Sequence, residues 1–167
     1  MRILPKLIPL RINSINDPLK LLKKRALYYL GKREYSRHEL SNKLASYAIE
    51  LQISNNEIQD LLDELEKNNW LSDQRFLEQF IFAKKKKFGP RKIAHELFNK
   101  GIDEGLIEKN LSEMKQEENF LIKEIWKKKY NSLPTTNEEK LKQVRFLQSR
   151  GFDLSLIHQI IAGKDKD

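Results

Sequence analysis

The segment 97–111 of this chain recurs fifty residues later as 147–161, and this internal repeat restricts the possible folds more than any other feature. Both copies contain a basic residue, a glycine, an apolar residue and an aspartate in that order, at 100–103 and at 150–153. Apolar residues on either side are spaced three and four apart, as in an amphipathic helix. Because glycine ends helices in the left-handed conformation and aspartate caps the next helix, each copy predicts two helices joined by a sharp turn.

A fainter copy of the same pattern lies nearer the N-terminus. Residues 40–44 correspond to 93–97, and residues 53–62 correspond to 102–111, in the spacing of their apolar side chains. This copy has no glycine at the turn and carries an insertion at about Ala48–Leu51. We therefore expect its connection to be longer than the other two and differently built.

Residues that cap helix N-termini mark where the helices begin. Three Ser or Thr residues are each followed three positions later by Glu, at 36–39, 54–57 and 136–139, which is the spacing of a capping box. Pro18 and Pro90 suit the first turn of a helix, where a missing N–H costs nothing. Together with the apolar spacing, these signals predict helices that begin near residues 18, 36, 54, 73, 90, 103, 117, 136 and 153.

Nine helices in three related sets predict an all-α chain of three tandem three-helix repeats. The only long interior loop that we expect is Asn131–Thr136, which contains Pro134. The predicted organisation is an N-terminal extension (1–17), a first repeat unit with a divergent turn (18–69), a second repeat unit (70–115), a third repeat unit (116–163) and a tail (164–167).

The charge balance favours a polyanionic partner, because 32 Lys and Arg against 24 Asp and Glu leave a net charge of +8 at pH 7. The absence of cysteine excludes disulfides and thiolate metal sites and fits a reducing cytoplasm. Pro5, Lys6 and Pro9 interrupt the apolar start of the chain, so we expect no export signal. No uncharged apolar run approaches the roughly 20 residues of a membrane-spanning helix, and we expect no membrane contact.

Motifs for catalysis are incomplete in this sequence. Two His-Glu pairs, at 38–39 and 95–96, begin like the zinc-protease pattern, but Asn42 and Asn99 stand where its second His belongs. Neither G-x-x-x-x-G-K nor G-x-G-x-x-G occurs, so nucleotide binding is unsupported. The many carboxylates of residues 60–66 lie on the polar face of a helix, where solvated charge is expected. We therefore predict a protein that is not an enzyme and that needs no metal or cofactor.

Basic residues recur in register with the repeat, in or just after the first helix of each unit. Because equivalent positions of a stacked array line one side, these clusters and the nearby cations predict a continuous basic stripe. The predicted stripe consists of Lys23, Lys24, Arg25, Lys32, Arg33, Lys84, Lys85, Lys86, Lys87, Arg91, Lys92, Lys127, Lys128, Lys129, Lys142 and Arg145.

A simpler interpretation is that these lysines only complement helix dipoles and keep the protein soluble. Against it, the four consecutive lysines 84–87 repel one another within a single turn, beyond what the dipole requires. We expect a partner to bring the counter-charge. Phe82, Phe88 and Tyr130 lie near the lysine clusters, where they could stack on a base or anchor a protein interface.

Two helices joined by a tight turn also suggest a helix-turn-helix DNA reader, whose second helix would present basic or amide side chains to base edges. Here the corresponding helices, 54–68 and 103–113, are rich in Asp and Glu. Such helices repel phosphates, so any contact with nucleic acid should be weak, salt-sensitive and independent of sequence.

Several segments, in order along the chain, resemble the RecX family over roughly residues 20–161. Two differences are the first turn, with its insertion and missing glycine, and Asn68-Asn69-Trp70, where relatives tend to carry glycine. The matching segments are Ala26–Leu30, Arg33–Arg37, Glu39–Leu40, Trp70–Phe76, Gly89–Ile93, Glu96–Leu97, Lys100–Ile102, Lys127–Tyr130 and Phe146–Phe152.

This resemblance implies a regulatory protein of bacteria that binds the RecA recombinase, above all its filament on DNA, and restrains recombination and SOS induction. It also implies three repeats of three helices that form an elongated, curved molecule thought to lie in the helical groove of the filament. The protein would act as a cytoplasmic monomer. The alternative that we keep open is a general DNA-binding module that does not recognise sequence and has DNA itself as its target.

Overall fold

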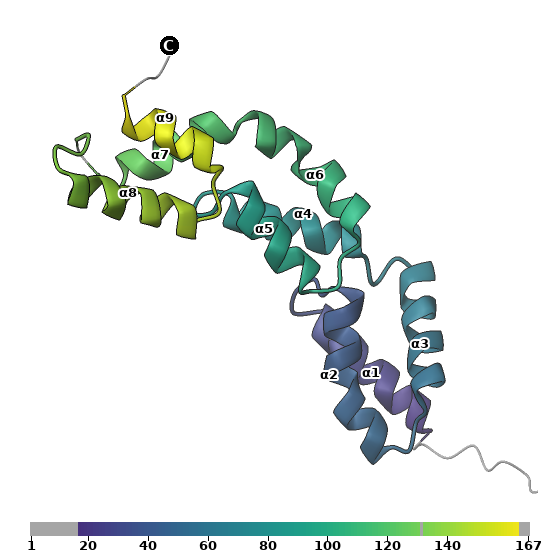
Figure 1. Ribbon diagram of the computed structural model, residues 1–167. Helices are drawn as coiled ribbons and strands as arrows, with labels where there is room; N and C mark the ends of the chain where they lie inside the picture. The colour runs from purple at the N-terminus through teal and green to yellow at the C-terminus, as the bar shows by residue number, and fades with distance from the viewer. Residues whose placement is uncertain (1–16, 131, 164–167) are drawn as a thin grey trace, which may run out of the picture.

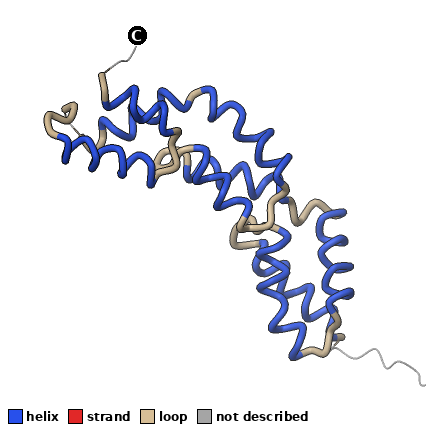
Figure 2. The backbone as a smooth tube through the Cα atoms, in the orientation of Figure 1, coloured by secondary structure: helices blue, strands red, loops and turns tan. Residues whose placement is uncertain are grey.

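The computed structural model describes residues 17–130 and 132–163, which form nine α-helices and no strand (Figures 1 and 2). None of these helices is both long and apolar enough to cross a lipid bilayer. The predicted tail and all of the predicted N-terminal extension except Asp17 lie outside the described residues. The helices are α1 (Pro18–Leu30), α2 (Arg37–Glu50), α3 (Asn55–Lys67), α4 (Asp73–Lys84), α5 (Pro90–Phe98), α6 (Glu104–Gln116), α7 (Glu118–Lys127), α8 (Asn137–Ser149) and α9 (Leu154–Ile161).

The helices form three consecutive trios, each around its own apolar core. The three cores contain the fully buried side chains of Leu44 in α1–α3, Leu97 in α4–α6 and Leu147 in α7–α9. The trios follow one another along a curved and elongated path, from purple to yellow in Figure 1. The predicted all-α, three-repeat architecture is therefore confirmed. The unit boundaries stay predictions, and α6 extends to Gln116, the first residue of the predicted third unit.

The turn between the second and third helices has the same backbone in all three trios. Gly101 and Gly151 have φ of 76° and 85°, and Gln52 at the first turn has φ of 54°. The residue after each of them donates its N–H to a carbonyl five positions earlier; in the first trio Ile53 donates to Ala48 at 2.8 Å. The side chain of Ile53 is buried, as are those of its counterparts.

The expectation of a longer, differently built first connection is therefore wrong. The insertion lengthens the helix instead: α2 has 14 residues and α5 has 9, and the insertion at 48–51 accounts for four of the five additional positions. Four residues make about one helical turn, so the insertion leaves the apolar face and the turn in register. The first turn differs from the other two in one respect: Gln52 stands where they have glycine, and a residue with a side chain is strained in the left-handed region.

Successive units are joined where the turn glycine of one unit meets the second helix of the unit before it. A Cβ atom at Gly101 would lie 2.5 Å from the Cβ of His38, in the first turn of α2. A Cβ atom at Gly151 would lie 2.4 Å from the Cβ of Lys92, in the first turn of α5. Both junctions therefore need glycine for its missing side chain as well as for its positive φ.

Hydrogen bonds to the residue before each turn glycine fix the same two junctions. The hydroxyl of Ser36, the N-cap of α2, donates to the carbonyl of Lys100 at 2.7 Å. The N–H of Gly89, the N-cap of α5, donates to the carbonyl of Arg150 at 2.8 Å. The junctions thus carry Lys100 and Arg150 from one unit onto the preceding one.

Candidate binding surface

Three cations surround the half-buried ring of Phe88 at the second junction. Lys84 at the end of α4 and Lys92 in the first turn of α5 place their Nζ atoms 5.3 and 4.8 Å from the ring centroid. The guanidinium of Arg150 lies 5.2 Å from the same centroid. Arg150 reaches Phe88 because its own carbonyl is bound to Gly89, so docking of the third unit completes this cluster.

Contacts between cations and rings continue from Phe88 in both directions along the array. Arg150 and Lys129 lie 5.2 and 5.6 Å from the centroid of Phe146, toward the C-terminal end of α7. On the other side, Lys84 and Lys100 lie 5.2 and 5.7 Å from the centroid of Phe80. Lys100 stands at the first junction, so these contacts span the whole second unit.

The contacts extend into the first unit through an acidic link. Glu39 binds Lys100 at 2.5 Å and Arg33 at 3.1 Å, and the guanidinium of Arg33 lies 3.6 Å from the ring centroid of Tyr35. The rings of Tyr29 and Tyr28 follow at 6.0 Å intervals. We call the whole series the cation–aromatic chain; its members are Lys32, Tyr28, Tyr29, Tyr35, Arg33, Glu39, Lys100, Phe80, Lys84, Phe88, Lys92, Arg150, Phe146 and Lys129.

Some residues of the predicted stripe belong to the cation–aromatic chain, but Lys23 does not. The Nζ of Lys23 binds Glu64 of α3 at 2.5 Å and lies 5.5 Å from the ring centroid of Trp70. Residues two apart on a helix point in nearly opposite directions, so Lys23 faces α3 while Arg25 faces α2. The stripe residues that belong to the cation–aromatic chain are Lys32, Arg33, Lys84, Lys92 and Lys129.

Further stripe residues differ in whether the protein itself neutralises them. Arg91 pairs with Asp153 across the second junction, and Lys84 pairs with Glu96 at 3.0 Å. Lys85 makes only a ring contact, 6.0 Å from the centroid of Phe82. The exposed stripe residues without an ion pair to a described residue are Lys24, Arg25, Lys32, Lys85, Lys86, Lys87, Lys127, Lys128, Lys129, Lys142 and Arg145.

Sequence reasoning missed three cations that the structure places on this surface. Lys100 and Arg150 occupy equivalent positions in the cation–aromatic chain, and Lys43 lies 5.3 Å from the ring centroid of Tyr29. The sequence contained a signal for Lys100 and Arg150, because each is the basic residue before a turn glycine of the repeat. Only the docking of the turns shows that they reach the lysine clusters.

Carboxyl groups at the junctions have shifted pKa values. Burial alone would raise the pKa of Glu39, but hydrogen bonds from Lys100 and Arg33 outweigh burial and lower it. Burial raises the pKa of Glu118, whose carboxylate accepts the N–H of Asp153 at 2.8 Å. Burial also raises the pKa of Asp73, which accepts the N–H of Arg37 at 2.7 Å. The ion pairs of Glu39 therefore strengthen the first junction when this carboxyl is ionised.

Comparison with known proteins places this chain in a family. The model for the second three-helix domain of RecX matches residues 72–111, and the model for the third matches residues 116–161. The regulatory protein RecX of Chromobacterium violaceum is 42% identical over 148 residues, which cover 89% of this chain and 93% of that protein. The chain belongs to the RecX family. Its relatives are named regulatory proteins.

Other RecX proteins agree in sequence and in fold. The regulatory protein RecX of Ralstonia pickettii is 37% identical over 150 residues, 90% of this chain and 91% of that protein. The crystal structure of RecX from Lactobacillus salivarius matches with a TM-score of 0.68 at 22% identity, over 89% of this chain and 97% of the other. A second RecX crystal structure matches with a TM-score of 0.71 at 21% identity, over 88% and 74%. The RecX fold is thus shared at low sequence identity.

Proposed function

We propose that this chain binds the RecA recombinase and its filament on DNA and, from the groove of that filament, inhibits recombination, ATP hydrolysis and SOS induction. Membership of the RecX family supports the regulatory role. The observation that carries the binding mode is the cation–aromatic chain, which crosses both junctions and so holds cations of all three units at fixed spacing. Cations at fixed, repeated spacing suit a partner that is itself a repeating polymer.

The physical advantage of three linked surfaces is multivalency. A single exposed ion pair contributes about 0.2–1 kcal/mol, so one unit alone binds weakly. Once one unit is bound, rigid junctions keep the other units near their own sites and raise their effective concentration. Obstruction of the groove then hinders filament growth and strand exchange by steric exclusion. The proposal takes the protein to act as a cytoplasmic monomer.

Inhibition of the DNA-dependent ATP hydrolysis of the cognate RecA tests the proposal. The variant Lys85→Ala/Lys86→Ala/Lys87→Ala removes three exposed cations that form no ion pair with described residues. We expect a loss of inhibitory potency of about tenfold, since three exposed contacts at roughly 0.5 kcal/mol each sum to about 1.5 kcal/mol.

The matched control is Lys67→Ala/Lys109→Ala/Lys115→Ala, which removes the same charge from α3 and α6. We expect this variant to inhibit as the unchanged protein does. Equal potency of all three proteins would refute the assigned surface. Co-purification with RecA in the absence of DNA separates the proposal from the DNA-binding alternative, because a module that targets only DNA would not be retained.

A further inference from the structure

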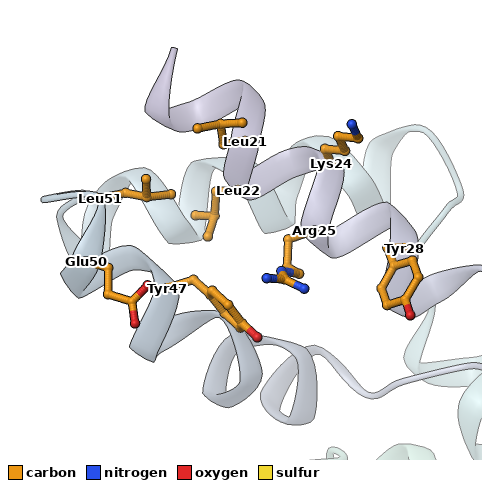
Figure 3. A pocket seen from close by; sticks show the side chains of 8 residues that line it. All are labelled: Leu21, Leu22, Lys24, Arg25, Tyr28, Tyr47, Glu50 and Leu51. Carbon is orange, nitrogen blue, oxygen red and sulfur yellow. The ribbon is translucent and has the colours of Figure 1, made fainter. Parts of the chain in front are cut away.

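An open groove lies between α1 and α2 of the first unit (Figure 3). Its volume is about 430 Å³, within the range of sites that hold a small ligand or one large side chain. The groove is lined by Leu21, Leu22, Lys24, Arg25 and Tyr28 from α1, by Tyr47 and Glu50 from α2 and by Leu51, which follows α2.

The walls of the groove are apolar and incompletely covered. Leu22 is fully buried, whereas Leu21 and Tyr28 are 40% and 54% exposed. Leu51 and Tyr47 are half-buried on the α2 side. Neighbouring apolar side chains that stay exposed on one side of a groove and half-buried on the other leave a surface that another molecule can cover.

Cations that form no ion pair with a described carboxylate line the α1 side of this groove. Arg25 extends from α1 into the space between the helices, and its guanidinium lies 4.1 Å from the ring centroid of Tyr47 (Figure 3). The ring holds the planar guanidinium in place while leaving its N–H groups free for a carboxylate. Lys24 is exposed, and Lys32 lies 4.3 Å from the ring centroid of Tyr28 at one end of the groove. Glu50 is the one acidic residue among the lining residues.

Two other grooves have the opposite charge. The groove between α1 and α3 has three carboxylates, of Glu57, Asp60 and Glu64, against Lys20 and Lys23, and Glu64 already neutralises Lys23. The groove between α5 and α6 contains two glutamates and Lys115 beside its apolar residues. Of these three grooves, the one between α1 and α2 is the one with more cations than carboxylates among its lining residues, with Lys24 and Arg25 against Glu50.

We infer that the groove between α1 and α2 binds an acidic peptide segment of a partner protein, and that one bulky apolar side chain of the segment fills the groove. Carboxylates of the segment would bind Arg25 and Lys24, while its apolar side chain would contact Leu21 and Leu51. This inference goes beyond the proposed function and is independent of it, because it needs no recombinase filament.

The groove suits a peptide better than two other occupants. A nucleobase would need a free aromatic face, but Arg25 already covers one face of Tyr47 and Lys32 lies over the ring of Tyr28. The segment 1–16 of this chain is rich in Leu and Ile, yet it contains Arg2, Lys6 and Arg11 and no acidic residue. Its charge therefore repels that of the groove.

Fluorescence polarisation with the full chain tests the inference. The probe is a fluorescein-labelled synthetic peptide of Asp and Glu residues with one central Phe. We expect Lys24→Ala/Arg25→Ala to weaken binding about tenfold, and Leu21→Glu to weaken it at least as much. A probe with Ala in place of Phe should also bind about tenfold more weakly. Since Leu21, Lys24 and Arg25 are exposed, thermal melting should show that both variants stay folded.

Controls separate this groove from a general attraction between charges. The variant Lys67→Ala/Lys109→Ala has the same net charge as Lys24→Ala/Arg25→Ala and should bind the probe like the unchanged chain. Equal binding by all variants, or by both probes, would overturn the inference. Displacement of the probe by a synthetic peptide of residues 1–16 would instead assign the groove to that segment. Tighter binding of a labelled oligothymidylate, lost in the same variants, would assign it to nucleic acid.

Discussion

Replacement of the turn glycine at the second junction, Gly151→Ala, should separate the third unit from the second. The new Cβ would lie 2.4 Å from the Cβ and 2.5 Å from the backbone nitrogen of Lys92. A backbone atom inside a helix cannot rotate away, so the third unit must shift. This shift breaks the hydrogen bonds from the amides of Gly89 and Arg91 to the carbonyls of residues 150 and 151, at 2.8 and 3.3 Å.

The expected loss of stability has two sources. A residue with a side chain in the left-handed region costs about 1–2 kcal/mol, and Gly151 has φ of 85°. The two broken hydrogen bonds cost about 0.5–1.5 kcal/mol each. The total is roughly 2–5 kcal/mol, which for a chain of this size lowers the melting temperature by roughly 5–15 °C.

Calorimetry and amide hydrogen exchange measure the two consequences of Gly151→Ala. We expect a lower transition temperature and faster exchange of the Gly89 and Arg91 amides. The control is Gly31→Ala, where φ is −68° and the nearest atom to the new Cβ is 3.4 Å away. This change should be neutral or stabilise by up to about 1 kcal/mol. A Gly151→Ala variant that melts with the unchanged protein and protects both amides would refute the docking argument.

Three further changes probe the turns and junctions. Gln52→Gly should stabilise the first unit by up to about 1 kcal/mol in thermal melts, because it relieves a left-handed residue. Glu118→Gln should raise the free energy of unfolding at pH 7, because burial raises the pKa of Glu118 and its ionisation therefore opposes folding. This gain should vanish when the pH falls below 4.5, the ordinary pKa of a glutamate side chain. Lys100→Ala should destabilise the chain by about 1 kcal/mol near pH 7, measured by urea unfolding. Because the pKa of Glu39 is lowered, this difference should shrink as the pH falls below 4.5, and a constant difference would contradict the role of Glu39.

Local signals in the sequence predicted the helices and their starts with few errors. The capping boxes at Ser54 and Thr136 form as their spacing indicates, whereas the predicted box at Ser36 forms only by half, because the carboxylate of Glu39 pairs with Arg33 and Lys100 instead. The glycines of the two close repeats adopt the positive φ that their positions predict. These features depend on interactions within a few residues, so the chain segment itself contains the information. The prediction failed at Gln52, because a tertiary fold can hold a residue other than glycine in the left-handed region.

The position of each cation in space depended on the tertiary structure. Lys23 and Arg25 are neighbours in one basic cluster, yet the packing of α1 between α2 and α3 turns them to different partners. Arg150 is distant from Phe88 in sequence and reaches its ring only because Gly151 docks on Lys92. The sequence by itself determined a repeated helical unit, since its periodicity and caps are local. Only the docking of one unit on the next decided which cations share a surface, because that contact joins residues about sixty positions apart.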